Sequence, residues 1–171
     1  MKKAWLVIAA AALAIVALVI FDKGEPPGGG EPVTYSARSF DGGEKVSTDD
    51  LRGSPALLTS WASWCTECRT ELPQLEDFWK SKDSNGLQVV AVNLDSTGGD
   101  GPAARAAAEF GLTMPIWSDT DGRFTGYFHG IGVPMSVLLD GDGEVVKVWQ
   151  GPIDFSDAKA MAPIHEVLRE N

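Results

Sequence analysis

The only two cysteines of the 171-residue chain, Cys65 and Cys68, lie together in the stretch WASWCTECRTELP. A disulfide between them would close a very small loop and restrict the unfolded chain little, so it would stabilise the fold only weakly. Three residues of helix bring two such side chains to the same face. The spacing therefore predicts a reactive pair of thiols.

Two other uses of this spacing are disfavoured by the flanking residues. Covalent haem attachment needs a histidine directly after the second cysteine, where this chain has Arg69. A zinc site needs two further ligands, but the only histidines, His129 and His165, are too far apart for zinc-finger spacing. No metal site is expected, and thiol–disulfide exchange remains.

A strand and a helix must position the two thiols. The apolar run PALLTSW predicts a buried strand over 55–61, and the spacing of leucines and aromatic residues predicts a helix over 66–82. Cys65 then lies at the positive N-terminal end of that helix, where unpaired N–H groups stabilise a thiolate. We expect Cys65 to be the exposed nucleophile and Cys68 to resolve the mixed disulfide. The charge of Glu67 opposes the helix end and argues against an extreme oxidant.

The rest of the chain alternates strand-like and helix-like segments. We expect a kink at Pro73 and a break at Pro163. The predicted elements are a strand over 87–94, a helix over 101–112 that ends at Gly111, a short helix and loop over 119–132, a hairpin over 135–149 and a final helix over 154–170. This order predicts an α/β domain with a central mixed sheet and helices on both faces.

The N-terminal region predicts a membrane anchor. Residues 4–21 form an uncharged apolar run of 18 residues, near the lower limit for crossing a bilayer. Lys2 and Lys3 precede it, which favours a cytoplasmic N-terminus and an external domain. We interpret residues 1–21 as an uncleaved single-pass anchor, with a cleaved signal peptide as the alternative. Residues 22–33, rich in proline and glycine, then form a linker to a domain over 34–171.

Charge excludes one class of partner. The part of the chain after Phe21 carries 12 basic and 24 acidic residues. A surface this acidic repels phosphate backbones, so we expect no binding of nucleic acid.

The cysteine motif resembles that of the membrane-tethered thioredoxin-like proteins of the TlpA/ResA/CcmG type. The matching stretch is SWASWCTECRTELP, and the similarity extends from about Ser39 to the C-terminus through FDGGEKVSTDDLRG, VVAVNLD and GVPMSVLLDGDGEVV. The resemblance implies a thioredoxin-like fold with an N-terminal transmembrane helix. It also implies a redox-active Cys65–Cys68 disulfide as the only redox group, with no separate cofactor.

The resemblance also implies a substrate-binding surface. Pro134 matches the cis-proline that faces the cysteine pair in this family. A cis bond there leaves the N–H and C=O of Val133 available to pair with an extended substrate segment. Trp64, Thr66 and Glu67, which adjoin the cysteines, are expected to complete this surface.

The chain departs from the family at two positions. Glu67 stands where a proline often precedes the second cysteine, and Thr59 stands where thioredoxins carry a buried aspartate. The proton acceptor for Cys68 is therefore open. Asp95 is a candidate, because it follows the second predicted strand and would share a sheet edge with the cysteines.

The function expected from these features is reduction of specific protein disulfides outside the bacterial cytoplasmic membrane, in the periplasm or its equivalent. By resemblance, the electron donor is a membrane thiol carrier of the CcdA/DsbD type. The target is apocytochrome c, as in cytochrome c biogenesis, or a copper-site protein. The alternatives are a module that holds Cu(I) through the two thiolates, or a disulfide oxidase or isomerase.

Overall fold

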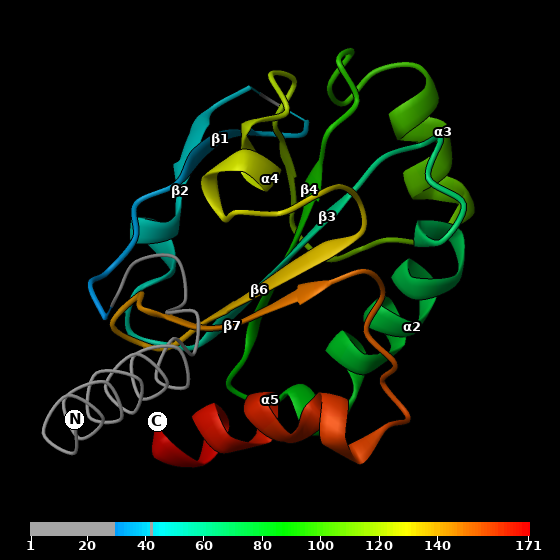
Figure 1. Cartoon of the computed structure of the whole chain (residues 1–171). Helices are drawn as coiled ribbons and strands as arrows, with labels where there is room; N and C mark the ends of the chain where they lie inside the picture. The colour runs from blue at the N-terminus through cyan, green and yellow to red at the C-terminus, as the bar shows by residue number, and fades with distance from the viewer. Residues whose placement is uncertain (1–29, 42) are drawn as a thin grey trace, which may run out of the picture.

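Apolar strands form the centre of a seven-stranded mixed sheet in the computed structural model, which describes residues 30–41 and 43–171 (Figure 1). The order across the sheet is β2-β1-β5-β4-β3-β6-β7. β4 is parallel to both β3 and β5, and the other neighbours are antiparallel. The long strands are β3 (Ala56–Trp61), β4 (Gln88–Asn93), β6 (Met135–Leu139) and β7 (Val145–Gln150). The predicted mixed sheet is confirmed, and all four strands lie within segments predicted from the sequence or end one residue beyond them.

Three short strands, which follow β4 toward one edge of the sheet, were not predicted. They are β1 (Ser36–Ser39), β2 (Lys45–Ser47) and β5 (Ile116–Ser118). Each has only three or four residues, which is too short for an alternating pattern to be recognised. They form because distant segments meet: Arg38 of β1, for example, pairs with both Lys45 and Ser118.

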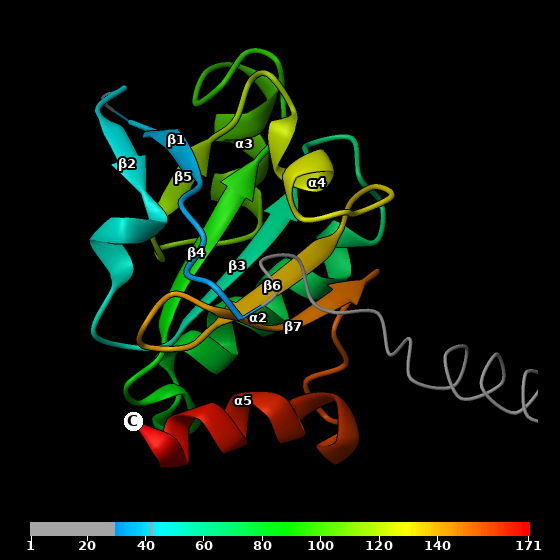
Figure 2. The same ribbon diagram turned by 60° about the vertical axis from the view of Figure 1, so that its left-hand side comes forward.

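Helices lie on both faces of the sheet (Figure 2), and alternate residues of the central strands belong to two separate cores. Leu57 and Leu138 belong to the core beneath three helices, whereas Leu58 and Val137 belong to the core on the opposite face. The helices of the first layer are α2 (Cys68–Lys80), α3 (Pro102–Glu109) and α5 (Ala158–Glu170), and α4 (Arg123–Tyr127) covers the other face. Two short 3₁₀ helices, η1 (Thr48–Leu51) and η2 (Lys82–Ser84), complete the set among the described residues.

Two expectations for the helices need correction. α2 begins at Cys68 rather than Thr66, because residues 66 and 67 form a turn that leads into it. The predicted break at Pro163 is wrong, since α5 continues through it, and α2 likewise continues through Pro73. Each proline lies inside its helix and removes one i→i−4 hydrogen bond, but buried side chains before and after it keep the helix packed on the core.

The predicted anchor and most of the predicted linker, residues 1–29, lie outside the described residues. Within residues 30–41 and 43–171, no helix combines the length and apolar character needed to cross a membrane.

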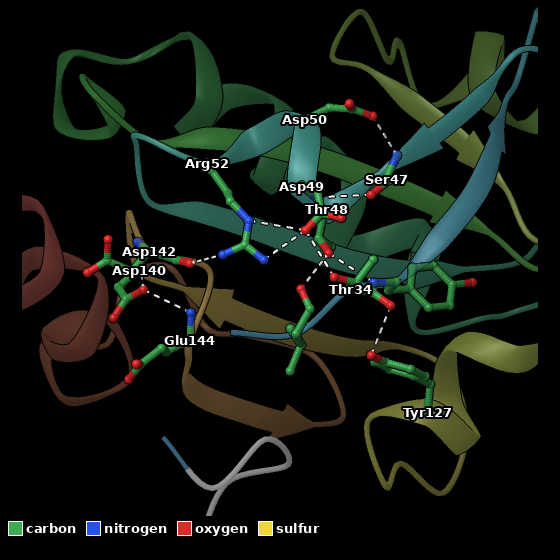
Figure 3. Close-up of polar contacts among 12 residues, drawn as sticks. Thr34, Ser47, Thr48, Asp49, Asp50, Arg52, Tyr127, Asp140, Asp142 and Glu144 are labelled. Atoms are coloured by element: carbon green, nitrogen blue, oxygen red, sulfur yellow. Dashed lines mark hydrogen bonds and ion pairs between the residues drawn. The ribbon is translucent and has the colours of Figure 1, made fainter. Parts of the chain in front are cut away.

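Polar contacts attach the first described segment to three other parts of the fold (Figure 3). The Thr34 hydroxyl donates to Asp49 of η1 over 3.0 Å, and the Tyr127 hydroxyl of α4 donates to the Thr34 carbonyl over 3.0 Å. Arg52 joins Asp49 at 2.8 Å and also donates to the carbonyl of Asp142 in the β6–β7 turn. The start of the domain is thus fixed to both α4 and the turn.

A buried carboxylate joins α2 to the loop before β5. Glu76 accepts from the backbone N–H groups of Thr113 and Met114 at 2.9 and 3.2 Å, from the Thr113 hydroxyl, and from Lys80 at 2.7 Å. Burial opposes ionisation of Glu76, but these hydrogen bonds outweigh it and hold its pKa below the ordinary value. The ionised form of Glu76 therefore stabilises the fold.

We predict that Glu76→Gln lowers the free energy of unfolding at pH 7 by about 1.5–3 kcal/mol, because an amide cannot accept from all four donors. Since the folded state lowers the pKa of Glu76, the difference between the two proteins should shrink as the pH falls below about 4. Urea denaturation measures both effects.

Glu109→Gln is the matched control. Glu109 forms an exposed ion pair with Arg69, so its loss should cost no more than about 0.5 kcal/mol. Equal losses in the two variants would contradict the role given to Glu76.

Candidate active site

The junction between β3 and α2 holds the two cysteines as a disulfide. β3 ends at Trp61, and Cys68 is the first residue of α2. The Cα atoms of Cys65 and Cys68 are 5.4 Å apart. The backbone N–H of Cys68 donates to Cys65 Sγ over 3.2 Å. This N–H has no carbonyl partner within the helix, so it donates to the sulfur of Cys65, where it would stabilise a thiolate.

The exposure of Cys65 is lower than expected. In the disulfide form, Cys65 is 3% exposed and Cys68 is fully buried, and both belong to the core beneath the three helices. The expectation of an exposed Cys65 is therefore wrong for this oxidised state, because the bonded sulfurs pack inward. Trp64, which precedes Cys65, is 70% exposed, and Thr66 and Glu67 are exposed as well.

The segment before β6 lies at the same end of the sheet as the cysteines. The Val133–Pro134 peptide bond is cis, as the family resemblance implies. Ser60 near the end of β3 pairs with Met135, and the Ser60 hydroxyl bonds both backbone polar groups of Met135 at 3.1 Å. Val133 and Pro134 therefore lie beside the point where β3 leads into the cysteine motif.

Asp95 lies at this end of the sheet, where the sequence predicted it, but its described hydrogen bonds go elsewhere than to Cys68. Its two oxygens accept from the backbone N–H and the hydroxyl of Ser63 at 2.8 and 2.7 Å. Asn93 donates to the same carboxylate at 2.7 Å. These contacts hold the loop between β3 and Cys65. The proton-acceptor role of Asp95 stays a prediction.

Thr59 replaces the buried aspartate of thioredoxins with a neutral pair. It is fully buried, and its hydroxyl lies 2.9 Å from the hydroxyl of Ser136 on β6. The hydrogen bond between these two hydroxyls thus gives the buried polar group of Thr59 a partner without placing a charge there.

Glu71 is a candidate functional residue that the sequence analysis missed. It lies one helical turn after Cys68 on α2 and is only 2% exposed. One carboxylate oxygen accepts from the Ile153 N–H at 2.7 Å, and the other is buried without a partner among the described residues. Burial raises the pKa of Glu71 to about 7, which the bond from Ile153 only partly offsets. The i, i+3 spacing from Cys68 could have indicated this group.

A hollow of about 490 Å³ opens beside the cysteine pair. It is lined by residues of the first turns of α2 and of the segment after β7: Glu67, Thr70, Glu71, Gln74, Pro152, Ile153, Asp154 and Ser156. Three carboxylates and no basic side chain line it, so it suits a neutral or cationic group. Within residues 30–41 and 43–171, no cluster of three or more His, Cys, Asp or Glu side chains could hold a metal ion.

Comparison with known proteins gives consistent results. The family model for Redoxin matches residues 30–162. The chain is 30% identical to sporulation thiol-disulfide oxidoreductase A of Bacillus subtilis over 75% of its own length and 77% of that protein. It is also 30% identical to the thiol-disulfide oxidoreductase ResA of Bacillus thuringiensis, covering 61% of this chain and 60% of ResA.

Solved structures of other proteins have a fold similar to that of this chain. A Chlorobium tepidum structure described as a thiol:disulfide interchange protein DsbE matches with a TM-score of 0.67 and 29% identity. The match covers 86% of this chain and 96% of that one. The structure of StoA from Bacillus subtilis matches with a TM-score of 0.61, also at 29% identity, over 80% of this chain and 97% of StoA.

We predict that Glu71 makes stability depend on pH near neutrality. The folded state binds the Glu71 proton more tightly than the unfolded chain does, so stability falls as the pH rises toward 7. Between pH 5 and pH 8 the oxidised wild type should lose roughly 2 kcal/mol more than Glu71→Gln. Urea denaturation at the two pH values measures this difference.

Glu67→Gln provides the comparison, since Glu67 lies on the same turn but is exposed. It should retain the pH dependence of the wild type. A wild-type pH dependence in Glu71→Gln would show that Glu71 is not the titrating group.

Proposed function

The chain belongs to the Redoxin family and is a thioredoxin-like thiol-disulfide oxidoreductase of the ResA/CcmG type, and from this premise we propose that it reduces disulfides of specific protein targets. The observation that carries the exchange chemistry is the hydrogen bond from the Cys68 N–H to Cys65 Sγ, and the direction of electron flow is argued separately from the nearby charges. That donor favours a thiolate at Cys65, which is the attacking form in thiol–disulfide exchange.

The reaction proceeds in two exchanges. In the reduced enzyme, the Cys65 thiolate attacks one sulfur of the substrate disulfide, whose S–S bond breaks, and the leaving sulfur takes a proton from water. Cys68 then gives up its proton and attacks the mixed disulfide at Cys65. The second substrate thiol leaves with a proton, and the enzyme ends as the Cys65–Cys68 disulfide. Two electrons pass to the substrate.

We propose Glu71 rather than Asp95 as the acceptor of the Cys68 proton, because both oxygens of Asp95 already accept hydrogen bonds from Ser63 and Asn93. The pKa of Glu71, about 7, means that Glu71 exists in both protonation states near neutrality. It can therefore accept a proton from Cys68 and release it to the departing thiol. Its position one turn after Cys68, with one oxygen unpartnered, supports this role.

The charges near Cys65 support reduction as the direction of electron transfer. A strong oxidant needs a greatly stabilised thiolate. Glu67 stands between the cysteines, and together with Glu71 and Asp154 it makes up the three carboxyl groups that line the adjacent hollow. Their negative charge opposes the thiolate and favours a reductant.

We further propose that the domain acts outside the cytoplasmic membrane, tethered by residues 1–21 and a linker over 22–33. The uncharged 18-residue run and the preceding lysines support this arrangement. A membrane thiol carrier of the CcdA/DsbD type would supply the electrons. The targets would be disulfides of apocytochrome c or of a copper-site protein.

We predict different outcomes for the two cysteine variants. Cys65→Ser should abolish turnover, whereas Cys68→Ser should accumulate a mixed disulfide through Cys65, because the resolving step is missing. Mass spectrometry after mixing each reduced variant with a disulfide peptide identifies the linked cysteine. Accumulation of a mixed disulfide through Cys68 in the Cys65→Ser protein, with none through Cys65 in the Cys68→Ser protein, would reverse the assigned roles.

We also predict a reducing potential, which tests the proposed function. The potential should lie nearer about −270 mV, typical of thioredoxin, than about −120 mV, the value of a strong oxidant. Equilibration with glutathione buffers measures it, and a value above about −160 mV would remove the reductant role. Glu67→Pro should raise the potential by deleting a negative charge, whereas Asp83→Asn, a change on η2 far along the chain from the cysteines, should not.

A further inference from the structure

The loop between α4 and β6 presents an aliphatic side chain directly to solvent. Ile131 is 92% exposed, the highest value among the large hydrophobic residues that are exposed in the described chain. A single exposed aliphatic residue needs no explanation by itself. The backbone around Ile131, however, is held in place by specific contacts.

Gln150, the last residue of β7, holds this loop through its side chain. Its Oε1 accepts from the Ile131 N–H at 3.2 Å, and its Nε2 donates to the His129 carbonyl at 3.5 Å. On the other side, the Gly130 N–H donates to the carbonyl of Thr125 in α4 at 2.6 Å. His129 adopts a φ of 56°, the left-handed region that few residues other than glycine enter. The conformation of the loop is therefore determined by several independent contacts.

Close packing fixes the loop against the end of the sheet. A Cβ added at Gly130 would lie 2.0 Å from Met135 Sδ, so only glycine fits there. Met135 is fully buried and pairs with Ser60 near the end of β3. The loop thus has a defined position relative to the strand that leads to Cys65.

Ile131 lies next to Val133, whose backbone the family resemblance implies pairs with an extended substrate segment. It precedes Val133 by two residues, which is at most about 7 Å of chain. Residues 129–134, HGIGVP, contain no Asp, Glu, Lys or Arg, although the chain beyond Phe21 carries 12 basic and 24 acidic residues. A substrate segment paired with Val133 therefore meets an uncharged, aliphatic surface at this point.

We propose that Ile131 is a specificity-determining residue that favours protein disulfides with an apolar side chain about two residues from the attacked cysteine. Gln150 is a positioning residue that holds Ile131 outward. This inference rests on the proposed function, since it concerns the choice among disulfide substrates. The contact would bury part of Ile131 and of the substrate side chain, which removes apolar surface of both from water.

The test uses two disulfide peptides that differ only in Leu or Ser two residues from the cysteine. The reduced full-length wild type should show a kcat/KM about tenfold higher for the Leu peptide, equivalent to about 1.4 kcal/mol. Ile131→Ser should bring the ratio close to one, and Ile131→Leu should restore it. Val146→Ser is the matched control, because Val146 is another exposed aliphatic residue, on β7, and it should keep the tenfold preference.

Gln150 is tested by two variants and a second readout. Gln150→Ala should reduce the preference and speed amide hydrogen exchange at Ile131, because the acceptor for that N–H is lost. Gln150→Glu keeps an oxygen acceptor and should retain most of the preference. Wild-type preference in Gln150→Ala would overturn the positioning role.

The rate with oxidised glutathione separates the two proposals. If the wild type reduces oxidised glutathione but reduces both peptides equally, or if Ile131→Ser keeps the preference, the inference about Ile131 is overturned while the proposed function stands. If the wild type reduces neither glutathione nor the peptides, the proposed function itself fails.

Discussion

The hydrogen bond from the Cys68 N–H to Cys65 Sγ depends on where β3 ends and α2 begins. Because α2 starts at Cys68 itself, the Cys68 N–H has no carbonyl partner within the helix and donates to the preceding sulfur. Extending the helix by one turn toward Trp61 would give this N–H a carbonyl partner within the helix and remove it from the sulfur. The Ser63–Asp95 contacts, which fix the loop between strand and helix, therefore matter to the chemistry although Asp95 bonds neither cysteine among the described contacts.

Buried carboxylates serve different purposes in this acidic domain. Glu76 has a donor for each of its oxygens, so its charged form is favoured and it joins α2 to a distant loop. Glu71 has one partner and one unpartnered oxygen, so burial dominates and its proton is held to a higher pH. The same residue type on the same helix is thus structural at one position and suited to proton transfer five residues earlier. The number of hydrogen-bond donors around each carboxylate decides which of the two roles it has.

The segment proposed to pair with substrate, Val133 and Pro134, is held in place by contacts outside the cysteine motif. Ser60 fixes Met135, the Gly151 N–H donates to the Pro134 carbonyl at 3.0 Å, and Gln150 holds the loop around Ile131. These contacts place the cis-proline segment and the loop around Ile131 at the end of the sheet that also holds the cysteines, so the selection proposed for Ile131 depends on contacts separate from those of Cys65. A change in selectivity therefore need not alter the chemistry of Cys65.

The sequence by itself determined the reactive pair, the strand and helix that position it, the central strands and the family. All of these follow from local information: the spacing of Cys65 and Cys68, helical and alternating apolar periodicity, and a short motif. The tertiary structure decided the strands β1, β2 and β5, the partners of Asp95, the burial of Glu71 beneath Ile153 and the contact of Gln150 with Ile131. Apart from the contact between Asn93 and Asp95, each depends on residues from 7 to 82 positions apart in the chain. Whether a polar group is paired or left alone in the interior is set by such distant neighbours, and no local pattern records it.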